Sequence, residues 1–104
     1  MKYLTSVLIA FCFLAGNASW AAGDIEQGSA KAAVCKGCHG PEGVSINPLW
    51  PNLAGQHQAY LVKQITAFRD GTRTDATMQP FVGTLTDADI QDLAAFYASR
   101  SGCK

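Results

Sequence analysis

Cys35-Lys36-Gly37-Cys38-His39 is the stretch of sequence that decides the fold. Its two cysteines are three residues apart, so on a helix both side chains point to the same side. His39 follows directly, and at about 100° per residue the three side chains fall within a sector of roughly 100°. Two thiols and an imidazole on one face can hold a planar ligand from one side.

The spacing C-x-x-C-H is typical of covalent haem attachment, in which both thiols form thioethers and the imidazole reaches the iron. Other interpretations stay open. A redox dithiol would follow a strand in a βαβ unit, and no such pattern precedes Cys35. A structural zinc site needs four ligands, which Cys35, Cys38, His39 and either His57 or Cys103 could supply. A disulfide between Cys35 and Cys38 would close an unusually tight loop.

A haem iron bound by His39 needs a second axial ligand, and Met78 is the leading candidate. It lies in an apolar loop, two residues before Pro80. Thioether sulfur is a soft ligand that suits haem iron and raises its reduction potential. The alternatives are that Met78 only fills the core and that His57 is the ligand, although the polar neighbours of His57 favour an exposed position.

The N-terminal segment has the pattern of a secretory signal peptide. Lys2 precedes an apolar run at residues 3–16, and small residues follow at Ser19 and Ala21. The run is shorter than the about 20 residues that a membrane-spanning helix needs. We therefore expect residues 1–21 to be cleaved, with a cut after Ala18 as the alternative.

Residues 22–104 are then expected to form one small domain of 83 residues. A chain of this size buries only about 60% of its unfolded surface and often needs a cofactor, metal or disulfide for stability. Seven basic and eight acidic residues give it a net charge of −1. Without a strongly basic run, nucleic acid is not an expected partner.

A first helix is predicted from Asp24 to about Lys36. Asp24 can cap its N-terminus, and Gln27, three residues later, would complete a capping box. Gly28 lies inside this helix, where glycine costs about 1 kcal/mol relative to alanine. The residue is either a tolerated defect or the point at which another helix approaches closely.

Two further helices are predicted at residues 57–70 and from Thr86 onward. The second helix has an apolar stripe at helical spacing and ends at Gly71. In the third, Thr86 is the expected N-cap, and its apolar face consists of Ile90, Leu93, Phe96 and Tyr97. No segment alternates as a strand would, so the expected class is all-α, with three main helices.

The two remaining stretches, residues 40–56 and 71–85, are rich in proline and glycine and show no periodicity. They nevertheless carry apolar side chains, which makes disorder improbable: Ile46, Leu49, Trp50, Leu53, Phe81 and Val82. Three short helices offer these loops little surface to pack on. A large apolar cofactor would offer more, so we expect long loops wrapped around a haem.

The region from residue 22 onward resembles class I cytochromes c, in particular one half of a dihaem cytochrome c4 and small bacterial cytochromes c553. The resemblance rests on CKGCHG at 35–40, PNLAGQHQAYLVKQITAFRDGTR at 51–73, MQP at 78–80 and LTDADIQDLAAFYAS at 85–99. A second C-x-x-C-H is missing, so one haem is expected.

The resemblance implies a role for each matching residue. Cys35 and Cys38 would hold haem c, and His39 and Met78 would be the proximal and distal iron ligands. The carbonyl of Pro51 would accept the N–H of the proximal imidazole and fix its orientation. Gly28 would allow the N- and C-terminal helices to cross closely, against Phe96 or Tyr97. Cys103 has no counterpart and is either a free thiol or the site of an intermolecular disulfide.

An iron with two strong axial ligands has no open position for a substrate. We therefore expect an electron carrier in the bacterial periplasm and not an enzyme. Its partners would be redox proteins such as a membrane cytochrome complex, a terminal oxidase or a dehydrogenase. If Met78 were a weak ligand, the alternative would be an enzyme acting on peroxide or another small molecule.

Overall fold

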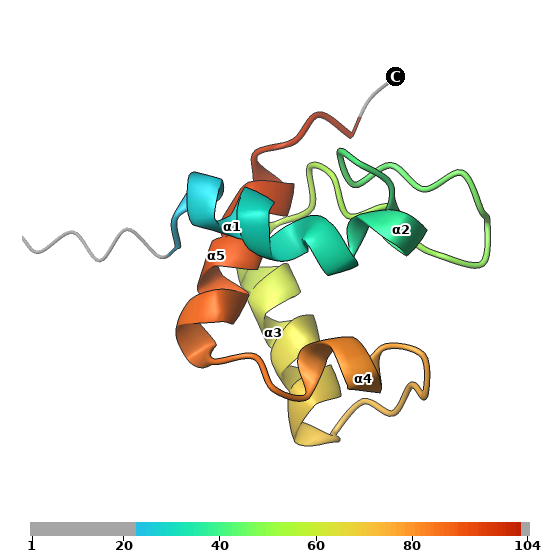
Figure 1. Ribbon diagram of the computed structural model, residues 1–104, viewed down its shortest axis with the longest axis vertical. Helices are drawn as coiled ribbons and strands as arrows, with labels where there is room; N and C mark the ends of the chain where they lie inside the picture. Colours follow the sequence, from blue (N-terminus) through green and yellow to red (C-terminus); the bar gives the residue numbers. More distant parts are fainter. Residues whose placement is uncertain (1–22, 103–104) are drawn as a thin grey trace, which may run out of the picture.

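The computed structural model describes residues 23–102 and contains only helices and loops within that range (Figure 1). The helical elements are α1 (Ile25–Lys31), the 3₁₀ turn η1 (Ala32–Val34), α2 (Lys36–His39), α3 (Gln58–Asp70), α4 (Gln79–Val82) and α5 (Asp87–Ala98). The prediction of an all-α fold with three main helices is confirmed, since α1, α3 and α5 are the longest. The predicted signal peptide and Cys103 lie outside the described residues.

The first predicted helix is broken, and this part of the prediction was wrong. α1 ends at Lys31, and a 3₁₀ turn separates it from α2, which carries Cys38 and His39. Asp24 does cap α1, because its carboxylate accepts the N–H of Gln27. The predicted capping box is absent: the Asp24 N–H donates instead to the Asp92 carboxylate, 2.8 Å away on α5.

α1 crosses α5 at Gly28, where the two backbones come into contact. A Cβ atom on Gly28 would lie 2.0 Å from the carbonyl oxygen of Asp92 and 2.8 Å from the Cβ of Phe96. Glycine is therefore required for close approach, and Phe96 is the predicted partner that it meets. Lys31 adds a second link between the same helices, since its ammonium bridges Asp89 and Asp92.

α3 and α5 agree with the sequence prediction to within a residue. His57 precedes α3, and Gly71 ends it in the left-handed conformation, with φ of 84°. α5 begins with a full capping box between Thr86 and Asp89. Its predicted apolar face is buried, and α5 packs against both α1 and α3. The core of the described region is therefore built around α5.

The two irregular stretches behave differently from each other. Residues 40–56 contain no helix or strand, as predicted, whereas residues 71–85 include the single turn α4, which the sequence analysis missed. Their apolar side chains are also divided. Val82 is buried, but Ile46 is 101% and Leu49 is 83% exposed. Within the described residues, no helix is long and apolar enough to cross a membrane.

Candidate haem-binding site

A cavity of about 590 Å³ lies among α2, α3, α4 and α5. Cys35, Cys38, His39 and Met78 all line it, although they come from two segments about 40 residues apart in the chain. Most of the remaining wall is apolar, with Leu61, Ile65, Phe68, Phe81, Val82 and Leu93 among its residues. The volume and lining are those of a pocket for a cofactor-sized ligand.

His39 has a fixed orientation and a defined proton position. It is buried, and its Nδ1 lies 2.8 Å from the carbonyl oxygen of Pro51. A carbonyl can only accept, so Nδ1 carries the proton and donates it. The other ring nitrogen, Nε2, therefore keeps its lone pair available for a metal.

Cys35 and Cys38 both face the cavity and are half-buried. Burial is the main cause that raises the pKa of the Cys35 thiol; the Tyr97 hydroxyl opposes this shift, and Cys38 adds to it. A thiol with a raised pKa is a poor nucleophile, which disfavours dithiol redox chemistry at this motif. Thioether formation would consume both thiols, and the resulting sulfur atoms would carry no ionisable proton.

Tyr97 places a polar atom in the same wall. Its hydroxyl is buried, and the polar group beside it is the thiol of Cys35. Burial raises the pKa of this phenol well above its usual value, and the neighbouring Cys35 adds to the shift. The side chain therefore stays a neutral phenol beside the thiol. It packs against Phe96, with the ring centroids 4.9 Å apart.

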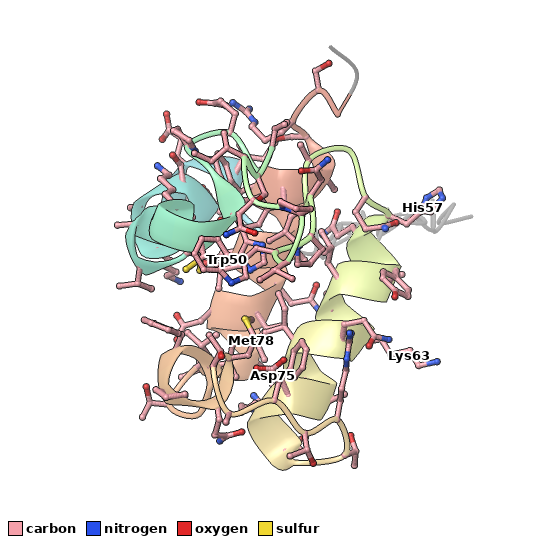
Figure 2. The ribbon with its side chains drawn as sticks, turned by 90° about the vertical axis from the view of Figure 1, so that its right-hand side faces the viewer. Trp50, His57, Lys63, Asp75 and Met78 are labelled. Carbon is pink, nitrogen blue, oxygen red and sulfur yellow. The ribbon has the colours of Figure 1, made fainter. Side chains whose placement is uncertain are left out.

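Met78 directs its side chain to the interior (Figure 2) and lines the cavity from the segment just before α4. The carboxylate of Asp75 fixes the backbone here. Its Oδ1 accepts the N–H of Thr77 at 2.8 Å and that of Met78 at 3.1 Å. Sequence analysis missed Asp75, although an aspartate that can accept the N–H groups two and three residues later is a recognisable capping signal.

His57, the rival ligand, lies elsewhere. It is exposed, and its side chain points away from the molecule in Figure 2. It is not part of the cavity wall. The zinc interpretation consequently loses this residue as its fourth ligand. Within residues 23–102, no cluster of three or more His, Cys, Asp or Glu side chains could hold a metal ion.

The residues present fit a covalently bound haem. The cavity offers two thiols for thioether bonds, an imidazole with a free Nε2, a thioether sulfur and an apolar wall. This donor set matches the chemistry of c-type haem ligation. The fold and site together define an all-α domain for a covalently attached haem.

Comparison with known proteins agrees with that class. Residues 25–101 match the family model described as Cytochrome c, and the chain belongs to this family. The family holds haem c through a cysteine pair, here Cys35 and Cys38 of the C-x-x-C-H motif.

Among the relatives of this chain are cytochromes c4 and a shorter cytochrome c. A cytochrome c4 from Thiocapsa roseopersicina is 49% identical over 79 residues, covering 75% of this chain and 41% of the relative. Cytochrome c-554(548) from Halomonas halodenitrificans is 44% identical and covers 76% of this chain and 99% of the relative. The crystal structure of reduced cytochrome c4 from Pseudomonas stutzeri superposes with a TM-score of 0.75 at 38% identity, covering 79% of this chain and 48% of the other.

This chain thus spans less than half the length of the cytochromes c4 that it matches. It also spans nearly all of the shorter cytochrome c-554(548). The similarity identifies a cytochrome c4-like domain from a family of electron carriers.

Proposed function

We propose that this protein is an exported one-electron carrier with a single haem whose iron is ligated by His39 and Met78. The observation that carries the proposal is the shared cavity. The attachment cysteines, the imidazole with its free Nε2 and the thioether all face this space, whereas His57 does not.

A haem held by Cys35 and Cys38 would supply an iron that can change between the ferrous and ferric states. The chain's own residues would set the orientation of the iron ligands and the reduction potential. Pro51 accepts the Nδ1 proton of His39, which holds the ring in one orientation and makes Nε2 a better donor. A thioether from Met78 favours the ferrous state and raises the potential. If His39 and Met78 both bound the iron, they would leave it no position for a substrate.

The apolar wall acts as a water-excluding shell for the electron transfer site. Leu61, Val82 and Leu93 are each at most 3% exposed, although they line the cavity. A shell that excludes water limits the solvent rearrangement that accompanies a change of charge, and it helps to set the potential. These side chains would therefore serve fast electron transfer.

The proposed site of action is the bacterial periplasm. It follows from the signal-peptide pattern of residues 1–21, which ends at small residues suited to cleavage. Mass spectrometry of the protein from a periplasmic extract tests this. A chain that begins at residue 22 and carries one haem supports export, and a chain that retains Met1 contradicts it.

The proposed partners are redox proteins such as a membrane cytochrome complex, a terminal oxidase or a dehydrogenase. Ile46, Leu49 and Phe81 are exposed and could make brief apolar contacts with them, whereas Val82, also considered for this surface, is buried. The near-neutral charge of residues 22–104 argues against strong electrostatic steering. A transfer rate that falls steeply with ionic strength would contradict this docking mode.

Visible spectra of the oxidised and reduced protein test the ligand pair. In the Met78→Ala variant, the weak far-red sulfur-to-iron absorption should disappear and the potential should fall. The matched control is His57→Ala, which should leave both unchanged because His57 is exposed and outside the cavity. The opposite pattern would move the axial ligand to His57.

A further inference from the structure

Tyr97 is a polar residue in a largely apolar wall. Its side chain is 1% exposed, and it lines the cavity from α5. No nitrogen or oxygen atom of the described residues pairs with its hydroxyl. Phenylalanine would supply the same ring without a buried hydroxyl, which costs free energy when it lacks a partner. The hydroxyl therefore indicates a partner of another kind.

The position of this hydroxyl is fixed by the packing of its ring. A Cβ on Gly43 would lie 2.8 Å from Cδ1 and 3.2 Å from Cε1 of Tyr97, so one edge of the ring lies against the Gly43 backbone. The ring of Phe96 is tilted against it at an interplanar angle of 60°. The Tyr97 carbonyl is held as well, since it accepts the N–H of Gly55 at 2.9 Å and that of Arg100 at 3.1 Å. Only the direction of the hydroxyl proton is left to rotate.

The polar atom within reach of this hydroxyl is the sulfur of Cys35. Cys35 packs against the core cluster to which Tyr97 belongs, and both residues line the cavity. A hydrogen bond joins the two side chains and opposes the rise in the Cys35 pKa that burial causes, which identifies the phenol as the donor. A thioether sulfur keeps its lone pairs and is still a weak acceptor. The same bond can therefore persist after Cys35 is attached to haem.

We propose that Tyr97 is a positioning residue that donates a hydrogen bond to the Cys35 sulfur in the haem protein and fixes the orientation of that thioether. This assignment rests on the haem-dependent electron carrier proposed above. A hydroxyl proton directed at the sulfur turns the positive end of a dipole toward the haem. It therefore disfavours the positive charge gained on oxidation and raises the reduction potential.

The test compares the Tyr97→Phe and Tyr60→Phe variants of the full-length haem protein. Each change removes one hydroxyl and keeps the ring. Tyr60 also lines the cavity, but it is 49% exposed, so its hydroxyl has access to water. Resonance Raman spectroscopy records the carbon–sulfur stretching vibrations of the thioethers in ordinary water and after equilibration in heavy water. Redox titration measures the potential.

In the wild type, exchange of the Tyr97 hydroxyl proton for deuterium should shift one carbon–sulfur vibration. Tyr97→Phe should abolish this deuterium shift and lower the potential. Tyr60→Phe should keep the deuterium shift and change the potential by less. A wild type without the shift would overturn the assignment, and so would a shift or a potential that Tyr97→Phe leaves unchanged. Those are the results expected of a hydroxyl that only fills space in the core.

If Tyr97→Phe yields no haem protein, the Cys35→Ala variant decides, because Cys38 alone can attach the haem. Loss of the deuterium shift from the remaining carbon–sulfur vibration supports the assignment, and its persistence overturns it. Absence of every thioether vibration would overturn the proposed haem attachment and the role of Tyr97 with it. Thioether vibrations that are present but insensitive to deuterium refute only the role of Tyr97. The axial ligand pair is reported separately by the far-red band of Met78→Ala.

Discussion

Substituting Gly28 by alanine should destabilise the protein, although alanine is the better helix former. A Cβ at this position would lie 2.0 Å from the Asp92 carbonyl oxygen, 2.6 Å from its carbon and 2.8 Å from the Cβ of Phe96. The first two atoms belong to the backbone of α5 and cannot turn away. α1 and α5 must therefore separate by more than about 1 Å to restore an ordinary contact of about 3.5 Å.

The magnitude follows from two opposing effects. Overpacking of this kind costs up to about 3 kcal/mol, while replacing glycine by alanine inside a helix gains about 1 kcal/mol. The net loss of unfolding free energy is roughly 2 kcal/mol. For a domain of this size, that loss lowers the melting temperature by about 8–16 °C.

Gly37 provides the matched control. It lies in α2, and a Cβ there would meet nothing within 4 Å. Gly37→Ala should therefore show only the helix gain, up to about 1 kcal/mol of added stability. Urea unfolding of both haem-loaded variants, followed by far-UV circular dichroism, measures the difference. If Gly28→Ala were as stable as Gly37→Ala, the close crossing of α1 and α5 would be refuted.

Three other predictions concern caps and charges. Asp75→Ala should weaken the far-red sulfur-to-iron band on mild heating, because the N–H of Met78 loses its acceptor. Asp75→Asn keeps an acceptor oxygen and should retain the band, so identical behaviour of the two variants would contradict this. Thr86→Ala should cost about 1 kcal/mol in urea unfolding through loss of the α5 N-cap; no loss would exclude the cap. Hydrogen bonding to Lys31 lowers the pKa of Asp89 from 3.8 to about 2. The ionised Asp89 carboxylate therefore stabilises the folded protein fully above about pH 4, and this contribution is lost as the pH falls toward 2. The stability gap between wild type and Lys31→Gln should therefore narrow from pH 6 to pH 3, and a constant gap would argue against this linkage.

Local signals in the sequence were sufficient for α3 and α5. Gly71 ends α3 and Thr86 begins α5, and each of these ends needs only neighbouring residues to form. The apolar spacing within each helix reports one buried face. The break after Lys31 was not predictable in this way. Residues 24–36 favour one continuous helix, and the structure instead turns through η1 so that Cys38 and His39 reach the cavity.

Two parts of the site escaped the sequence analysis for different reasons. α4 carries a visible signal, because Pro80 suits the first turn of a helix, but a turn this short has no periodicity to detect. The contact of Arg73 with Gln64, two residues of the cavity wall, depends on the chain reversing after Gly71, which places residues nine positions apart side by side. Such a pairing is set by tertiary structure and has no local pattern.

The distribution of the core explains why this domain needs its cofactor. Of the nine buried apolar residues in the range 23–102, six belong to α5. By contrast, α2 and α4, which lie next to the attachment cysteines and Met78, have only four residues each. Helices this short are unstable on their own. Bonds from Cys35, Cys38, His39 and Met78 to one haem would tie both segments to the same rigid group. Because only the folded chain presents these residues together, haem binding stabilises the fold at the site where electron transfer requires a fixed geometry.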